Sequence, residues 1–153
     1  MNECVFCKIV SGKEPSHKIY EDDEFLAFLS IEPNTEGVTV VIPKKHYPSY
    51  VFDLPENVYH KLLDATRVVA KQLDKNIEDS SWTALVFEGF QINHVHAKLY
   101  PLHGTAELAE WRPILSSEPE FNKEYPGYVT SRSGPRVDHS ELEEIAKKLR
   151  KVE

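Results

Sequence analysis

The sequence predicts an α+β domain built on an antiparallel sheet. Segments with the composition of short strands come first, a long amphipathic helix is inserted among them over residues 53–77, and a second helix closes the chain from about Asp138. This order of elements indicates the fold class. The chain length of 153 residues is sufficient for one domain to bury a core without disulfide bonds.

The strands are predicted from local composition and turn signals. Residues 18–31 contain two strands separated by a turn at 22–23, and the β-branched run over 38–42 predicts a third strand that ends at Pro43. Two further strands are expected at about 83–88 and 94–100. All of these segments are short, as strands of a small antiparallel sheet are.

The helix over 53–77 has both a start signal and an apolar face. Asp53 can cap it, Glu56 completes a D-x-x-E capping box, and Pro55 is tolerated in the first turn. Apolar side chains then recur at helical spacing, at Val58, Leu62, Ala65, Val69 and Leu73. The closing helix has a similar stripe, formed by Leu142, Ile145, Ala146 and Leu149.

Composition narrows the classes of partner and the location. The formal net charge of −7 argues against binding to extended nucleic acid, which normally requires a basic face. No apolar run is long enough to span a bilayer, and the N-terminal residues lack the layout of a signal peptide. We therefore expect a cytoplasmic protein without membrane attachment.

The only two cysteines form a C-x-x-C pair, Cys4 and Cys7. Together with His46 and one histidine of the segment 94–100, they could form a Cys₂His₂ zinc site, a common structural ligand set. A thioredoxin-like redox pair is the rival interpretation, but that motif is expected to follow a core strand and open a helix, and no strand is predicted before Cys4 in this sequence. Two reduced, buried cysteines beside an exposed histidine remain the third possibility.

The segment 94–100 concentrates the chemically reactive side chains. Alternate residues of a strand share a face, so His94, His96 and Lys98 should lie together with Tyr100. Val95, Ala97 and Leu99 would face the core. A polar face that is merely solvated is the alternative, but a row of histidines and lysine gains nothing from packing and favours a functional site.

Several motifs occur in a characteristic order: C-V-F-C-K-I-V-S-G, I-Y-E-D-D, V-I-P-K-K-H and H-V-H. In this order they resemble the histidine-triad (HIT) family, specifically its bacterial Hint-like branch. The resemblance implies a HIT domain over residues 1–110 and an irregular extension over 111–153 that ends in a helix and packs on the same domain. It also implies a five-stranded antiparallel sheet, with one long helix and the C-terminal helix, and a homodimer.

The resemblance further implies the roles of individual residues. Cys4, Cys7, His46 and His94 would bind structural zinc, and His96 would attack the α-phosphorus of a nucleoside phosphoramidate, dinucleoside polyphosphate or nucleotidyl ester to form a covalent nucleotidyl-histidine. A neutral imidazole suits this role, because it is nucleophilic at neutral pH. A purine nucleotide or nucleotide conjugate is the expected ligand. Its nucleoside would contact Val5, Phe6, Ile9, Phe28, Leu29, Ser30 and Ile31.

Three departures from the family pattern concern the surroundings of the nucleophile. Lys98 stands at the third histidine position, Ser30 replaces an aspartate that holds the ribose, and the loop over 87–93 is short. The Lys98 ammonium can stabilise phosphate oxygens electrostatically, and Gln91 and Asn93 could supply hydrogen bonds in place of the missing loop. The stretch 125–136 also carries groups that suit phosphate, although an exposed loop explains it equally well.

Two alternatives to an active hydrolase or nucleotidyl transferase remain open. The first is a nucleotide-binding module of the same fold with little turnover, which the three departures favour. The second is a zinc-stabilised protein-interaction module that binds no nucleotide.

Overall fold

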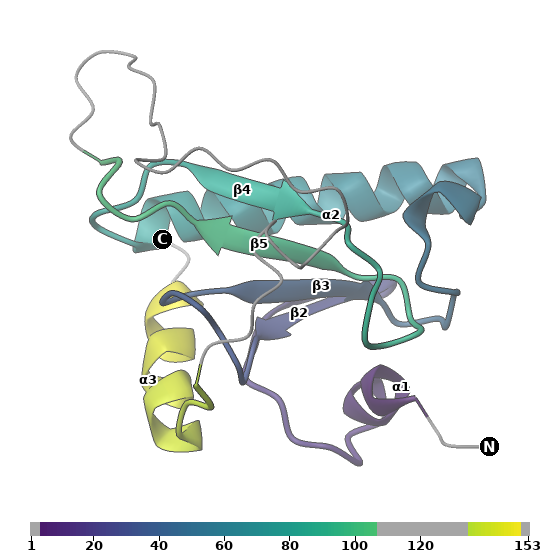
Figure 1. The fold of residues 1–153 in the computed structure, drawn as a ribbon, viewed down its shortest axis with the longest axis horizontal. Helices are drawn as coiled ribbons and strands as arrows, with labels where there is room; N and C mark the ends of the chain where they lie inside the picture. The colour runs from purple at the N-terminus through teal and green to yellow at the C-terminus, as the bar shows by residue number, and fades with distance from the viewer. Residues whose placement is uncertain (1–3, 107–134, 151–153) are drawn as a thin grey trace, which may run out of the picture.

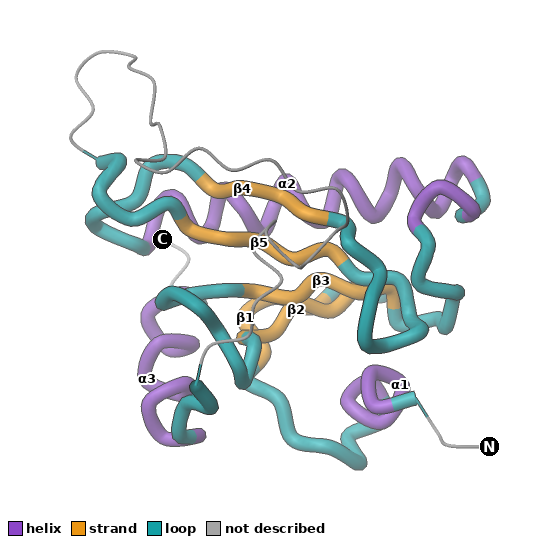
Figure 2. Tube along the Cα trace, in the orientation of Figure 1, coloured by secondary structure: helices purple, strands orange, loops and turns teal. Residues whose placement is uncertain are grey.

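A computed structural model describes residues 4–106 and 135–150 of the chain. Within them, three α-helices and five strands follow in the order α1 (Val5–Val10), β1 (Lys18–Glu21), β2 (Phe25–Leu29), β3 (Thr39–Pro43), α2 (Glu56–Asn76), β4 (Thr83–Val86), β5 (Ala97–Pro101) and α3 (His139–Leu149). A short 3₁₀ turn, Val51–Asp53, precedes α2. The predicted α+β class and the five-stranded antiparallel sheet are confirmed (Figures 1 and 2).

The sheet has the strand order β1-β2-β3-β5-β4, and every neighbouring pair is antiparallel. Strands β2 and β3 are buried along their whole length, which explains their nearly continuous apolar sequences. The crossing from β3 to β5 places β4 at one edge and β1 at the other. A row of paired residues, Phe28, Val40 and Lys98, therefore crosses the middle of the sheet on one face.

The two faces of the sheet carry different helices. On one face, α2 and α3 bury a large core against alternate strand residues such as Ala27, Val41 and Leu99. On the opposite face, α1 packs Phe6 and Ile9 on the alternate set of β2 and β3 residues. No helix within the described ranges is both long and apolar enough to cross a membrane.

The structure corrects the predicted start of α2. Asp53 lies in the 3₁₀ turn, Pro55 occupies the cap position, and no side chain caps the helix, so the predicted D-x-x-E capping box is wrong. The physical reason is Leu54, which precedes a proline and is extended, at φ −67° and ψ 147°. A residue before proline is sterically kept out of the helical region, and the helix therefore begins only at Glu56.

Other boundaries differ by a few residues. Strand β4 ends at Val86 rather than at residue 88, and β5 begins at Ala97, so His94 and His96 precede the strand instead of forming part of it. Cys4 occupies the N-cap position of α1 without a side-chain cap hydrogen bond, and Cys7 lies in the first turn, so the C-x-x-C pair lies at the start of this helix. At the other end of the chain, α3 begins directly after Asp138, where the sequence predicts a helix start, and Asp138 caps the helix by accepting a hydrogen bond from the Ser140 amide.

Candidate functional site

Four potential metal ligands converge beside α1. The group, called here the Cys₂His₂ cluster, consists of Cys4, Cys7, His46 and His94, and its ligand atoms all lie within 4.8 Å of one another. The Cys4 and Cys7 sulfurs are each 3.6 Å from Nδ1 of His94, and Cys7 Sγ is 3.4 Å from Nδ1 of His46. The cluster is thus a possible metal site.

These separations match tetrahedral coordination. A zinc ion with Zn–S bonds of about 2.3 Å and Zn–N bonds of about 2.0–2.1 Å holds its sulfur and nitrogen ligands about 3.5 Å apart. The His94 ring is oriented from its far side, because its Nε2 donates to the Pro43 carbonyl at 2.9 Å. Its Nδ1 lone pair therefore faces the sulfurs. Burial holds the pKa of His94 below its ordinary value, which favours the neutral ring that metal binding requires.

His96 lies directly beside this cluster and is almost completely buried. Its Nδ1 is 2.8 Å from the His94 carbonyl oxygen, which can only accept a hydrogen bond. Nδ1 therefore carries the proton, and the neutral ring keeps its lone pair on Nε2. Burial lowers the pKa of His96, and the nearby Lys98 ammonium lowers it further, against the opposing effect of the bond to the His94 carbonyl.

A cavity of about 270 Å³ lies on the α1 face of the sheet, and His96 lines it. Its floor includes the cross-strand row of Phe28, Val40 and Lys98, and Phe6 of α1 closes one wall. The Phe6 ring meets the His96 ring edge-on, with centroids 5.4 Å apart. The cavity thus combines an apolar interior with an imidazole and an ammonium group.

Most of the residues predicted to bind the nucleotide line this cavity. They are Val5, Phe6, Ile9, Phe28, Leu29, Ser30, Ile31 and Gln91. Asn93 is the exception: it is absent from the cavity lining, and its side-chain oxygen accepts a hydrogen bond from the Ser49 amide at 3.0 Å. Asn93 therefore holds the loop before the histidines and does not face the cavity.

The short loop before the histidines has an unusual backbone. Gln91, which lines the cavity, has φ +72°, a left-handed conformation that is uncommon for residues other than glycine. Nearby, Gly89 has φ +76°, and a Cβ there would come within 3.1 Å of the Ser49 carbonyl oxygen. Such conformations persist only where the surroundings enforce them, and they cluster at functional sites.

Sequence reasoning missed several cavity residues. They are Glu14, Pro15, Ser16, Glu32, Val40, Phe90, Ile92 and His139. Arg136 also lines the cavity and is the last residue of the stretch 125–136 that was singled out for phosphate; positions 125–134 lie outside the described residues. No periodic pattern connects His139 with a site formed by α1 and β2, so only the fold brings them together.

Comparison with known proteins identifies the family. The HIT domain family matches residues 11–103, more than half of the chain, and the chain therefore belongs to the HIT family. A HIT-like protein of Methanocaldococcus jannaschii is 31% identical over 132 residues, which cover 81% of this chain and 99% of that protein. An adenylylsulfatase of Arabidopsis thaliana is 34% identical over 65% of this chain and 52% of its own length.

A solved structure shows the same fold with a metal. The Zn-bound histidine triad family protein of Mycobacterium smegmatis superposes with a TM-score of 0.66 at 28% identity, covering 97% of this chain and 91% of that chain. The family match begins after α1 and ends before α3. Both cysteines, together with Arg136 and His139, therefore lie outside the matched domain.

Proposed function

We propose that this chain is a nucleotide hydrolase or nucleotidyl transferase that acts at the α-phosphate of a purine nucleotide conjugate through His96. The observation that carries this proposal is the hydrogen bond from His96 Nδ1 to the His94 carbonyl, which leaves Nε2 with a lone pair on a ring that lines the cavity. A neutral, oriented imidazole beside a cavity with an ammonium group fits nucleophilic attack on an anionic phosphorus centre.

The reaction would proceed in two displacements. In the first, the Nε2 lone pair of His96 forms a nitrogen–phosphorus bond while the bond from phosphorus to the leaving group breaks, and the leaving group departs with that electron pair. In the second, a water oxygen attacks the same phosphorus, the nitrogen–phosphorus bond breaks, and the ring returns to its neutral form as the water proton is released. Phosphoramidates, dinucleoside polyphosphates and nucleotidyl esters all have a leaving group bonded to the α-phosphorus and could react in this way.

Lys98 would stabilise charge on the phosphate rather than donate a proton. It belongs to the cavity floor, two residues beyond His96, where an ammonium can interact with non-bridging oxygens. An anionic phosphate beside Lys98 favours its charged form, which makes the lysine a poor general acid. Gln91 lines the same cavity and would add neutral hydrogen bonds to the phosphate or leaving group.

The Cys₂His₂ cluster would hold a structural zinc ion. Its donor set, two sulfurs and two imidazoles, and its sulfur–nitrogen separations fit tetrahedral coordination with no position left for substrate. The ion would fix the N-terminal helix to the loops that carry His46 and His94. All steps at phosphorus would be performed by residues of the cavity.

We also propose a homodimer formed through α2 and the strand at the sheet edge. Among the residues that the structure describes, strand β4 pairs only with β5, and it exposes Leu85, while Trp82 precedes it and Val68 is exposed on α2. An unpaired edge strand flanked by exposed apolar side chains is a surface that proteins normally cover. The long helix α2 and the strand β4, which begins at Thr83, both carry exposed apolar side chains of this surface.

Intact-mass spectrometry tests the catalytic proposal. The chain is incubated with adenosine and guanosine phosphoramidates and dinucleoside polyphosphates and is then rapidly denatured. We expect a nucleotidyl adduct that is absent from His96→Ala, whereas His60→Ala, a change at an exposed histidine of α2, retains it. Nucleotide affinity should survive in His96→Ala, because ground-state binding does not need the attacking nitrogen. Full turnover by His96→Ala would refute the covalent mechanism.

A binding module with little turnover is the second candidate. The Ser30 hydroxyl accepts a hydrogen bond from the Glu32 amide at 3.3 Å, so part of its capacity is used within its own turn. This use of the Ser30 hydroxyl, together with Lys98 at the third triad position, favours a site that binds a nucleotide but turns it over slowly. Nucleotide binding without an adduct or turnover for any substrate in the panel would support the module.

A further inference from the structure

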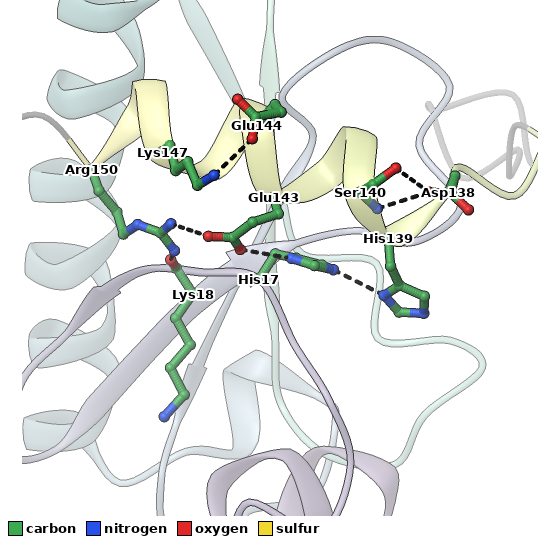
Figure 3. Close-up of polar contacts among 9 residues, drawn as sticks. All are labelled: His17, Lys18, Asp138, His139, Ser140, Glu143, Glu144, Lys147 and Arg150. Atoms are coloured by element: carbon green, nitrogen blue, oxygen red, sulfur yellow. Dashed lines mark hydrogen bonds and ion pairs between the residues drawn. The ribbon is translucent and has the colours of Figure 1, made fainter.

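A chain of hydrogen bonds runs from Glu143 through His17 to His139 at the N-terminal end of α3 (Figure 3), and His139 lines the cavity. One Glu143 oxygen lies 3.1 Å from Nδ1 of His17, and the other accepts from the Arg150 guanidinium at 2.6 Å. These two bonds, that from His17 first, lower the pKa of Glu143, so the carboxyl group remains an ionised acceptor. Arg150 also donates to the Lys18 carbonyl and so fixes α3 to β1.

The direction of the hydrogen bond between His17 and Glu143 follows from this acceptor. Because the Glu143 carboxylate cannot donate, Nδ1 of His17 carries a proton and donates to it. Nε2 of His17 lies 2.9 Å from Nδ1 of His139, and a hydrogen bond joins these two ring nitrogens. Figure 3 shows the remaining nitrogen of the His139 ring, Nε2, directed away from His17. These hydrogen bonds thus fix the His139 ring and leave its Nε2 available for a further hydrogen bond.

His139 lines the same cavity as His96, but it lies two residues after Val137, whose amide donates to the Ile31 carbonyl. Ser30 and Ile31 directly follow the end of β2. The register pairs Leu29 with Thr39 and Thr39 with Leu99, three residues beyond His96. At about 3.4 Å per residue, this offset separates the end of β2 from His96 by roughly 10 Å along the strands. A nucleotide whose α-phosphorus meets His96 would therefore extend its nucleoside toward His139.

A backbone hydrogen bond holds the segment before α3 at this end. The Val137 amide donates to the Ile31 carbonyl at 3.1 Å, immediately beyond Ser30. This bond places Arg136, with its guanidinium donors, on the same side of the cavity as His139. Arg136 and His139 therefore add a polar wall to a cavity whose interior is mainly apolar.

We propose that His139 binds a hydroxyl group of the ribose, positioned by His17 and Glu143, and that the site thereby selects ribonucleotides over deoxyribonucleotides. This inference rests on the proposed function. A ribose hydroxyl suits the position because it can both donate and accept, and so it can pair with Nε2 in either protonation state of the ring. His139 is the contacting residue, whereas His17 and Glu143 are positioning residues.

Binding measurements on the full chain test this assignment. Dissociation constants for AMP, 2′-deoxy-AMP and 3′-deoxy-AMP are measured by calorimetry. We expect the unaltered chain to bind AMP about three- to tenfold more tightly than one of the deoxy analogues, the range for one net hydrogen bond. In His139→Phe the ratio of the dissociation constants of that deoxy analogue and AMP should fall to about one, while the affinity for the deoxy analogue stays unchanged. His139→Gln should restore part of the preference for AMP.

Two further variants separate positioning from folding. His17→Ala should reduce the same ratio while leaving the deoxy analogue bound as before, which a general loss of structure would not do. His60→Phe, outside the cavity, should keep the full ratio. If His139→Phe kept the affinity ratio of the unaltered chain, the inference would be overturned. It would also be overturned if only Glu32→Gln lost the ratio, because the ribose would then be bound by a cavity carboxylate. Failure of the unaltered chain to bind AMP would overturn the proposed function and this inference together.

Discussion

Removing the metal from the Cys₂His₂ cluster should lower the melting temperature of the chain by about 5–15 °C. The cluster joins the cysteine pair to histidines 39 to 90 positions away in the sequence, so the four ligands meet only in the folded state. An ion that binds the folded chain alone stabilises it by about 2.7 kcal/mol at a hundredfold excess over Kd and about 4.1 kcal/mol at a thousandfold excess. A domain of this size changes its melting temperature by about 2–4 °C per kcal/mol.

The assay is thermal unfolding followed by circular dichroism, with free zinc either buffered in excess or removed by a chelator. Cys4→Ala should melt at the temperature of the metal-free chain and show no response to zinc. Ser11→Ala provides the matched control, because Ser11 bonds to the Lys8 carbonyl at the end of the same helix but lies outside the cluster. That variant should keep the full response.

Two results would refute the reasoning. Equal melting temperatures with and without zinc would show that the four side chains approach one another without holding an ion. A zinc response that persists in Cys4→Ala would place the ion elsewhere. Metal analysis of the purified chain should give about one zinc per chain, and the cysteine variant should lose it.

Three further predictions concern the cavity, assembly and pH. Lys98→Ala should reduce turnover about 10²–10³-fold, equally for good and poor leaving groups, in steady-state assays; a loss confined to poor leaving groups would instead assign proton donation to Lys98. Light scattering should give twice 17.6 kDa, with Leu85→Arg shifting the mass toward the monomer, and a monomeric unaltered chain would contradict the dimer. Burial opposes the raised pKa of His103, but the Glu36 carbonyl and the Asp79 carboxylate outweigh it. The resulting stabilisation of the folded state, below about 1 kcal/mol, is complete below pH 6.5 and is lost as pH rises through the folded pKa of His103. Denaturation curves at several pH values should show a smaller stabilisation in Asp79→Asn. An unchanged pH dependence in this variant would exclude a contribution from the His103–Asp79 pair.

Sequence patterns predicted the elements whose signal is periodic. The apolar stripe of α2 is buried at Leu62, Val69 and Leu73, and the alternation of Val95, Ala97 and Leu99 into the core is confirmed. Helix α1 escaped prediction because its six residues are too few to establish a period. The start of α2 was misplaced because the capping signal competed with the restriction that a proline imposes on the residue before it.

The same limit applies to the functional sites, because sequence reasoning finds local motifs but not distant partners. The two cysteines and the histidine-rich segment of the metal cluster are local motifs, but nothing in the spacing connects His46 with them. The cavity wall formed by Arg136 and His139 depends on how α3 packs against β1 and β2, which sequence spacing does not encode. His17 and Glu143 are 126 positions apart in the sequence, and only the fold brings them together.

His94 couples the two sites, because it uses its ring for one and its backbone for the other. The ring completes the Cys₂His₂ cluster and is braced by the Pro43 carbonyl, whereas its own carbonyl fixes the tautomer of His96. Metal bound at the ring would therefore restrain the peptide that orients the nucleophile, without contacting the substrate. Loss of the metal should act first on stability, and it should reduce turnover only to the extent that the His94 carbonyl moves away from His96 Nδ1. The proposed structural ion and the proposed nucleophile, whose residues are two positions apart, would thus both depend on one short, buried segment of chain.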